Sequence, residues 1–363
     1  MRKKYKISSN HYSKLESNRD RSNMNINIGL IGKGNVGTSF LRLLNEINLI
    51  LLNTFEFDIK VLGIFENDGA ILDENGINLE RLLKLGKDFR THANWKFGYR
   101  ALEYIGKLNL NIMIETTPTI PENGEPAKSH ILKALNNNMD VITSNKAPLY
   151  LDYKNIKKIA EDRMQLIRYE ATVASCVPIL SIKRNLQGNK IIGISAILNG
   201  TSNYILSKMT NNGCSFEQAL KEAQDLGYAE SNPDLDISGY DAAGKLVILA
   251  NELLDYDMTI KDVDVKGIEN VNKHDIELAK LNNRVIKQLS VAKNGYLFVK
   301  PHRVDKNSYF NVNDSLNIIE LETKNAGKIV LSGRGAGGIE AASAIMNDLI
   351  SIIQERNTPQ ANW

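Results

Sequence analysis

The 363-residue sequence predicts an α/β protein with an N-terminal Rossmann-type, doubly wound parallel sheet and a second, α+β domain. Three observations support this prediction. Short apolar segments alternate with segments of helical periodicity in the first half, a glycine turn joins the first strand to the first helix, and the rhythm changes after Pro178. Apolar strands that alternate with helices are typical of parallel sheets, because the crossover helices cover both faces.

The elements of the first half follow in order. The first strand begins at Asn25 and leads through the glycine turn into a helix whose apolar residues recur at helical spacing from Val36 to Ile47. Further strands are predicted at 58–65, 111–117, 140–145 and 164–173, with helices over about 125–136 and after Leu151.

The second half predicts a different order of elements. A strand is expected at 190–198, followed by helices over 201–209, 216–227 and 240–254. The segment 284–304 reads as a hairpin that turns at Asn294 and Gly295. Strands at 316–323 and 327–333 precede a closing amphipathic helix over 339–355. We expect a first domain at 25–168, a second at 169–336, and a closing segment, 337–355, that packs back near the first.

The composition excludes several classes of protein. With 42% hydrophobic and 24% charged residues and a net charge of +3, the chain is ordinary globular material without a basic stripe for nucleic acid. Cys176 and Cys214 have no metal-ligand spacing, which fits a reduced, cytoplasmic protein. The sequence contains no run of about 18 apolar residues, so it predicts no membrane-spanning helix.

Residues 1–24 carry seven lysines or arginines and lack the apolar core of a secretory signal. We expect them to form a disordered leader. Met24, directly before the first strand, is an alternative start of the natural chain.

The glycine turn has the pattern G-x-G-x-x-G, spanning Gly32, Gly34, Asn35, Val36 and Gly37. Between a strand and a helix, such glycines let the backbone approach a pyrophosphate, and the free N–H groups of the helix attract this anion. The pattern therefore predicts a dinucleotide site. Glu66, at the end of the second strand, is either an acceptor for the adenosine ribose or a plain surface acid. No arginine stands beside Glu66 in the sequence, which favours NAD over NADP.

The acidic stretch 227–245 ends on a pair of opposite charges. Asp241 and Lys245 are at positions i and i+4 of a predicted helix, so their side chains meet. An alcohol that gives a hydride to nicotinamide must also lose its hydroxyl proton, and a lysine whose pKa is tuned by its surroundings can take it. Routine surface salt bridges have the same spacing, so the residues alone leave both interpretations open.

Five segments together resemble homoserine dehydrogenases. They are TSNKAPL (143–149), YEATV (169–173) followed by Pro178, ILNGTSNYIL (197–206), the segment 216–246 and GRGAGG (333–338). The most specific pattern is GYAE-x-x-P-x-x-D-x-x-G-x-D-x-x-x-K at 227–245. The resemblance extends from about Asn25 to about Ile353. It implies reversible, NAD(P)-dependent interconversion of L-homoserine and L-aspartate 4-semialdehyde, a step toward threonine and methionine, in a second domain that serves catalysis and dimerisation.

The resemblance also implies roles in the substrate site. Lys245 is expected to transfer the proton, and Lys146 to be a second catalytic lysine close to nicotinamide and substrate. Glu230 and Asp236 would anchor the α-ammonium group of the substrate. Asp241 would orient its hydroxyl or carbonyl end.

Further residues are expected at the edges of this site. Thr116 and Thr117 end a strand beside the cofactor. Gly335 and Gly337 belong to a closing loop that returns near the nicotinamide. Thr201 would cap the helix that follows it and reach the substrate.

The family further binds a monovalent cation, often sodium. By resemblance its ligands here are Glu170, Val173, Ser175 and Val177. Relatives usually have the glycine-rich EASV-G-G-G-I-P at this point, whereas this chain has Ala174-Ser175-Cys176. The missing glycines restrict the backbone that would present the carbonyl ligands.

Two competing hypotheses concern function. Cys176 suggests an aldehyde dehydrogenase of the aspartate-semialdehyde type with a nucleophilic thiolate, although no flanking signature or histidine supports it. A regulator that binds NAD without catalysis is the other.

The resemblance also carries two expectations about assembly. The family forms dimers by joining sheets around residues 310–332, and the segment 316–323 alternates enough to serve as such a strand. The chain ends soon after its closing helix, so threonine feedback through an ACT domain is not expected.

Overall fold

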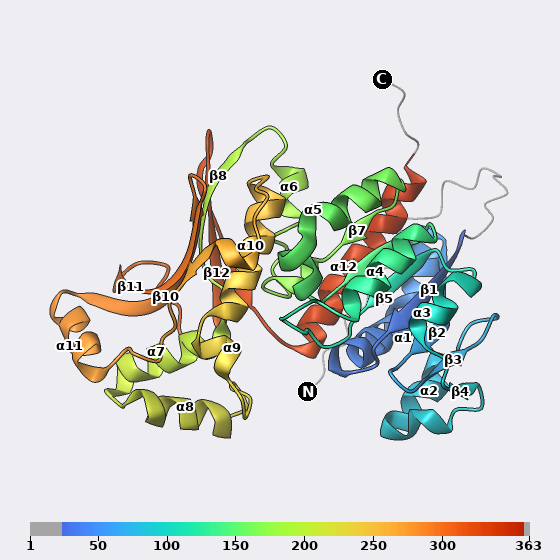
Figure 1. Ribbon diagram of the computed structural model, residues 1–363, viewed down its shortest axis with the longest axis horizontal. Coiled ribbons are helices and arrows are strands. Elements are labelled where there is room, and N and C mark those ends of the chain that lie inside the picture. The colour runs from blue at the N-terminus through green and yellow to red at the C-terminus, as the bar shows by residue number, and fades with distance from the viewer. Residues whose placement is uncertain (1–23, 359–363) are drawn as a thin grey trace, which may run out of the picture.

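A computed structural model describes residues 24–358 of the chain (Figure 1). The expected leader lies outside these residues except for Met24, which begins the first strand. Within 24–358, no helix is both long enough and apolar enough to cross a membrane.

Seven strands form the first sheet, in the order β4-β3-β2-β1-β5-β6-β7. They are β1 (Met24–Ile31), β2 (Phe57–Phe65), β3 (Gly69–Leu72), β4 (Trp95–Phe97), β5 (Ile112–Glu115), β6 (Asp140–Thr143) and β7 (Ile167–Arg168). The predicted parallel arrangement is confirmed for β2, β1, β5, β6 and β7. The sequence did not predict β3 and β4, which extend the sheet in antiparallel fashion and are too short to show a pattern.

The strand expected at 164–173 is much shorter in the structure. It ends at Arg168, and the chain then turns into the short helix η3 (Glu170–Thr172). The backbone N–H of Glu170 donates to Asp348 Oδ2 at 2.9 Å instead of to a neighbouring strand. A side-chain acceptor from a distant helix therefore ends the ladder at this point.

Helices cover both faces of the first sheet, as a doubly wound fold requires. On one face, α1 (Asn35–Phe55) and α12 (Gly338–Asn357) share a hydrophobic cluster with Ile28 and Leu30 of β1. On the other face, α4 (Ala127–Asn136) and α5 (Ala147–Asp162) pack in a cluster that includes Ile31. The alternation of side chains along β1 thus supplies both cores. Four short helices lie between β2 and β5: α2 (Leu79–Leu85), η1 (Gly86–Thr91), α3 (Ala101–Tyr104) and η2 (Ile105–Lys107).

Six strands form the second sheet, in the order β13-β12-β8-β10-β11-β9. They are β8 (Ile191–Ile197), β9 (Val263–Val265), β10 (Arg284–Lys293), β11 (Tyr296–Asp305), β12 (Leu316–Thr323) and β13 (Gly327–Arg334). The predicted hairpin is confirmed, since β10 and β11 pair and turn at Asn294 and Gly295, whose φ angles are +52° and +79°. The sequence missed the three-residue strand β9.

The helices of the second half gather on one side of this sheet. They are α6 (Ile182–Asn185), α7 (Gly200–Asn212), α8 (Phe216–Asp225), α9 (Asp234–Ile237), α10 (Tyr240–Leu253), η4 (Ile260–Asp262) and α11 (Lys273–Leu281). Helix α10 lies between the two sheets (Figure 1), and its residues share one core with α5 and with Ile194 and Ile319 of the second sheet. The residues that α10 carries near its N-terminus are therefore placed at the junction of the two halves.

A lysine is buried in the second half. Lys287 on β10 is 1% exposed, and its Nζ donates to Asn203 Oδ1 at 3.0 Å and Ser207 Oγ at 2.8 Å, both on α7, and to Val312 O at 2.5 Å. No carboxylate lies within 4.0 Å of this ammonium among residues 24–358. Burial lowers the pKa of Lys287 to about 8, against the opposing charge of Asp314.

We expect Lys287 to make the stability of the protein depend on pH. The folded chain loses this proton near pH 8, whereas the unfolded chain keeps it up to the ordinary pKa of 10.5, so the unfolded state binds more protons between these values. Stability therefore rises with pH in this window. Urea unfolding at about pH 7.5 and 9.5 should show the wild type gaining about 2 kcal/mol relative to Lys287→Met. Equal pH slopes in the two proteins would contradict the assignment.

Candidate active site

The glycine loop packs closely against the end of β5. Gly32 has a φ of +88°, and a Cβ added there would lie 2.9 Å from the backbone of Thr116. A Cβ at Gly37 would lie 2.1 Å from the carbonyl oxygen of Gly32. The Thr116 hydroxyl donates to the same carbonyl at 2.6 Å. The loop and the end of β5 therefore form one unit that only glycine permits.

The loop leaves open space where a cofactor would approach. A Cβ at Gly34 would meet no atom within 4 Å. Helix α1 begins at the next residue, Asn35, and continues through Val36, so its first N–H groups lie beside this space. Such groups and the helix dipole attract a pyrophosphate. The residues present at this strand end thus fit a dinucleotide.

Glu66 lies directly after β2, beside the same loop. Its Oε1 accepts the backbone N–H of Lys33. Arg90 of η1 lies nearby, held by Asp68 through Nε–Oδ2 and Nη2–Oδ1 contacts of 2.7 and 2.9 Å. The hydrogen bond to Asp68 and, more weakly, the charge of Glu66 raise the pKa of Arg90. No arginine is beside Glu66 in the sequence, but the structure brings Arg90 near it through the contact with Asp68.

Three charged side chains meet where α10 approaches α5. Lys245 Nζ lies 2.6 Å from Asp241 Oδ2, so the predicted i, i+4 contact is formed. Lys146 Nζ, at the start of α5, lies 3.2 Å from the other oxygen, Asp241 Oδ1. Lys245 is 8% exposed, and it also donates to the carbonyl of Leu198 at 2.8 Å. The pair is thus part of a buried cluster and not a surface salt bridge.

The two lysines determine the charge of the carboxylate between them. Burial alone would raise the pKa of Asp241, but the positive charges of Lys245 and Lys146 hold it well below its usual value. Asp241 therefore stays ionised at neutral pH, as an acceptor shared by two cations.

The first turn of α7 brings an amide to this carboxylate. Asn199 Nδ2 donates to Asp241 Oδ2 at 3.0 Å and to Asp236 Oδ1 at 2.6 Å. Burial and the charge of Asp241 raise the pKa of Asp236, while the hydrogen bond from Asn199 opposes the shift. Glu230 is exposed, and its carboxylate makes no hydrogen bond or ion pair with residues 24–358. The structure thus brings Asp236 into the cluster, whereas the exposed Glu230 is not hydrogen-bonded to any of its members.

The expectation that Thr201 caps α7 is wrong. Helix α7 begins at Gly200, so the capping position falls on Asn199, whose Oδ1 accepts the N–H of Ser202 at 2.8 Å. The Thr201 hydroxyl instead donates to the carbonyl of Tyr228 at 2.8 Å.

A second asparagine connects the cofactor side to the lysines. Asn145 Nδ2 donates to the carbonyls of Thr117 and Pro118, each at 3.1 Å. Because Asn145 precedes Lys146, the end of β5 and the start of α5 are fixed to one another.

The loop between β13 and α12 closes the other side. Gly337 has a φ of +136°, and a Cβ at Gly338 would lie 2.6 Å from Asn35 Oδ1. A Cβ at Gly335 would lie 1.4 Å from Asn317 Oδ1 on β12. The loop therefore reaches from the second sheet to the first residue of α1.

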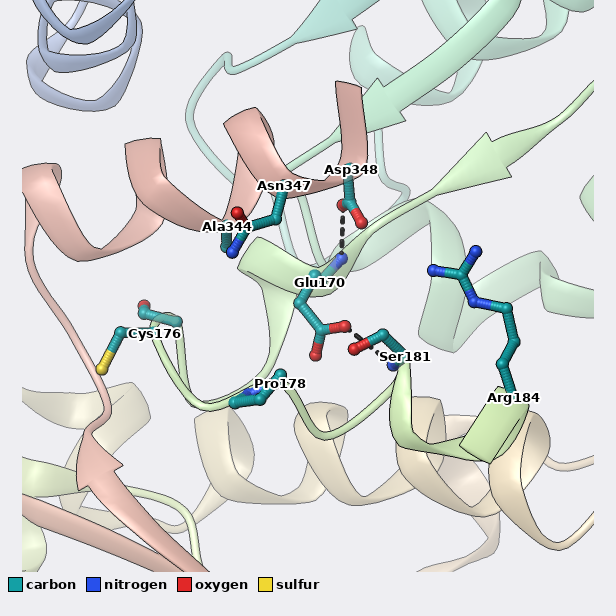
Figure 2. A pocket seen from close by; sticks show the side chains of 9 residues that line it. Glu170, Cys176, Pro178, Ser181, Arg184, Ala344, Asn347 and Asp348 are labelled. Carbon is teal, nitrogen blue, oxygen red and sulfur yellow. Dashed lines mark hydrogen bonds between the residues drawn. The ribbon is translucent and has the colours of Figure 1, made fainter. Parts of the chain in front are cut away.

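A cavity of about 220 Å³ lies between α12 and the segment that follows β7 (Figure 2). Glu170 extends into this region, and its carboxylate accepts the N–H groups of Leu180 and Ser181, each at 2.8 Å. Asp348 lies opposite (Figure 2), and burial and the charge of Glu170 raise its pKa to about 7. Two buried carboxylates thus share this cavity without an ion pair within 4.0 Å among the described residues.

The four residues expected to bind a cation are not gathered around this cavity as one set. Glu170 and Ser175 line it, whereas Val173 and Val177 do not. The carbonyl of Val177 accepts the N–H of Ile179 at 2.7 Å. Ser175 has a φ of +40°, so the chain adopts a left-handed turn here even without the usual glycines.

Cys176 lies on the rim of the same cavity. It is exposed, and its thiol donates to the carbonyl of Arg334 at 3.1 Å. Within residues 24–358 no histidine hydrogen bonds to this thiol. The arrangement lacks the base that a nucleophilic cysteine needs.

The sequence did not identify Asn199 or Asn145 as residues of the site. An asparagine before a helix is a capping signal, so the sequence could have indicated a capping role for these residues. Their side-chain amides also donate hydrogen bonds to carboxylates or carbonyls of distant segments, and the local sequence does not predict these contacts.

Comparison with known proteins gives a consistent result. The family model described as Homoserine dehydrogenase matches residues 178–350. The chain is similar to "Homoserine dehydrogenase" of Methanocaldococcus jannaschii, with 40% identity over 90% of this chain and 98% of that protein. It is also similar to "NAD(+)-dependent homoserine dehydrogenase" of Pseudomonas canavaninivorans, with 33% identity over 92% of this chain and 97% of that protein.

A solved structure resembles the whole described fold. It is a hyperthermophilic archaeal homoserine dehydrogenase in complex with NADPH, which matches with a TM-score of 0.79 and 26% identity, over 92% of this chain and 98% of that one.

We predict that the contact between Lys146 and Asp241 depends on a glycine in α10. A Cβ at Gly244 would lie 2.6 Å from the ring of Tyr150, which is buried on α5. Gly244→Ala should push α5 and α10 apart, lower the free energy of unfolding by about 1–3 kcal/mol and weaken the ion pair between the helices. Urea unfolding measures the loss. In the control Gly188→Ala, the added methyl meets no atom within 4 Å, and an equal loss there would contradict the prediction.

Proposed function

Since this chain belongs to the homoserine dehydrogenase family, we propose how its residues divide the reaction of that family. The chain is an oxidoreductase that interconverts L-homoserine and L-aspartate 4-semialdehyde with NAD or NADP. The nicotinamide supplies the acceptor or donor of the hydride. What remains for the protein is to bind both ligands at the junction of its two halves and to move one proton.

We propose that Lys245 moves this proton. An ammonium group has three N–H donors. In Lys245, one points to Leu198 O and one to Asp241, which leaves the third without a partner among residues 24–358. This third donor can protonate the forming alkoxide when the semialdehyde is reduced, and the amine form takes up the hydroxyl proton in the reverse direction.

Lys146 is proposed as the second catalytic lysine. It shares Asp241 with Lys245, and it follows Asn145, which is bonded to Thr117 on the cofactor side. Its side chain is 28% exposed, so it keeps access to a bound ligand. We propose that it polarises the carbonyl oxygen next to the nicotinamide, while Asp241 orients both lysines.

The substrate's amino-acid end is proposed to bind at the other side of Asp241. Asp236 on α9 and Glu230 in the segment before it are carboxylates, which suit an α-ammonium group. The backbone N–H groups of Gly200 and Thr201, at the start of α7, have no partner within residues 24–358 and suit the α-carboxylate. Carboxylates of the site would thus bind the substrate's ammonium group, and backbone N–H donors would bind its carboxylate.

The cofactor site is proposed to comprise the glycine loop, Glu66 and the closing loop. The open space beside Gly34 and the start of α1 support pyrophosphate binding there. Thr116, Thr117 and Gly337 would border the nicotinamide half.

We further propose that a monovalent cation binds beside Glu170. The support is that Glu170 and Ser175 line a cavity in which Asp348 is a second buried carboxylate. No step of the reaction is assigned to this cation. A cytoplasmic location is proposed because both cysteines are free thiols.

A homodimer is proposed through the face of the second sheet that points away from α10. The hydrophobic cluster on this face contains no helical residue, and Val330 and Ile192 are exposed by 40% and 37%. Strand β12 has a neighbour on either side, so within the described residues the edge strands of this sheet are β13 and β9.

Replacing Lys245 should strongly reduce turnover while leaving the fold intact. We expect Lys245→Ala to reduce kcat by about 100-fold or more, since the proton loses its carrier. The measurement is NADH or NADPH formation at about 340 nm with L-homoserine, with NAD and NADP assayed in parallel.

Two variants serve as controls for Lys245. Lys221→Ala removes the lysine of another i, i+4 pair with an aspartate, on α8, and should leave kcat unchanged. Cys176→Ser should also keep its turnover, and a collapse in rate there would favour thiolate chemistry instead.

The dimer prediction is tested by a charge on the exposed sheet face. Val330→Lys should convert a species of two 40.6-kDa chains into single chains, because like charges would oppose each other across the interface. Light scattering after gel filtration measures the mass. Leu281→Lys, on α11 and 83% exposed, should not change it. A wild type that is monomeric would refute the proposal.

A further inference from the structure

The start of α7 contains one amide that contacts both acids of the substrate site. Helix α9 lies beside α7 and α10 (Figure 1). Asn199 caps α7, hydrogen bonds to Asp236 of α9 and Asp241 of α10, and is 4% exposed. We infer that Asn199 is a positioning residue, which bridges Asp236 and Asp241 and fixes their positions so that one carboxylate serves the substrate's ammonium and the other serves the lysines. This inference rests on the proposed function, because that function assigns these tasks to the two acids.

The orientation of the amide follows from its three hydrogen bonds. Asn199 Oδ1 accepts the N–H of Ser202, and Nδ2 donates to Asp236 Oδ1 and Asp241 Oδ2 at 2.6 and 3.0 Å. A flipped amide would place its NH₂ group against an N–H and its oxygen against two carboxylates. Capping of α7 therefore fixes the direction in which the two N–H donors point.

The two acids need such a donor because they repel each other. The charge of Asp241 raises the pKa of Asp236, and so does burial. Proton uptake by Asp236 would remove the charge that an ammonium ligand requires. A lysine in place of the amide would neutralise the carboxylate, and an aspartate would add to the repulsion. An asparagine supplies two donors without changing the charge of the site.

The groups that face Asp236 come from two helices. Asp241 and Lys245 face it from α10, and Asn199 and Thr201 face it from α7. The hydrogen bond from Asn199 opposes the rise in the pKa of Asp236, and the positive charge of Lys245 opposes it more weakly. Loss of the amide should therefore raise the pKa of Asp236 further and leave the contact of Asp241 with Lys245 in place.

The test separates the effect of Asn199 as the cap of α7 from the effect of its two N–H donors. Asn199→Ser keeps an oxygen that can cap α7 but removes both N–H donors. We expect the KM for L-homoserine near pH 7 to rise by about tenfold or more, since a hydrogen bond to a charged group is lost. The value of kcat should change by less than about threefold, because Lys245 keeps its partners. The acid limb of the pH profile of kcat/KM should move to higher pH, because Asp236 keeps its proton to a higher pH. At pH values above this limb, the KM of the variant should return toward the wild-type value.

Two further variants complete the experiment. Asn199→Asp keeps the cap and the shape but adds a third carboxylate, so the rise in KM and the shift of the acid limb should both exceed those of the serine variant. Asn272→Ser changes the capping asparagine of α11, far from the cluster, and should leave KM, kcat and the pH profile unchanged.

The outcomes are distinguishable. A wild-type KM and pH profile in Asn199→Ser would overturn the inference. A variant with a lower kcat, a higher KM and a lower thermal stability together would also overturn it, because the residue would then act only through the fold. A wild type that does not oxidise L-homoserine would instead refute the proposed function.

Discussion

The carboxylate of Asp241 is the group on which the rest of the site depends. Its two oxygens lie 2.6 Å from Lys245 Nζ and 3.2 Å from Lys146 Nζ. The lysines come from α10 and the start of α5, and without an anion between them they would repel each other in a largely buried place. Asp241 therefore maintains both the geometry of the cationic groups and the close approach of the two halves of the chain.

A continuous line of contacts joins this carboxylate to the cofactor side. Thr116 is bonded to the glycine loop, and the next residue, Thr117, accepts a hydrogen bond from Asn145, which precedes Lys146. Each contact lies at the carboxyl end of a parallel strand, where α/β sheets bind their ligands. The cofactor and the proton-handling lysines are thus held in register by backbone and amide groups whose positions the sheet sets.

The fold was predictable wherever the signal is local. The hairpin over 284–304 turned where expected, because an Asn-Gly pair tolerates positive φ angles. The contact of Asp241 with Lys245 followed from helical periodicity. Short strands such as β3, β4 and β9 gave no such signal, since three or four residues cannot display a period. The helix cap was assigned to Thr201 instead of Asn199 because capping depends on the residue at which the helix begins.

By itself the sequence determined the alternation of strands and helices, the glycine loop and the helical register of Asp241 and Lys245, because each depends on residues a few positions apart. Only the tertiary structure decided that Lys146 shares the same carboxylate and that Asn199 lies between two acids. It also placed Arg90 beside the acid at the end of β2. These contacts join distant segments, and their distances are fixed by how helices and strands pack, which no short stretch of residues encodes.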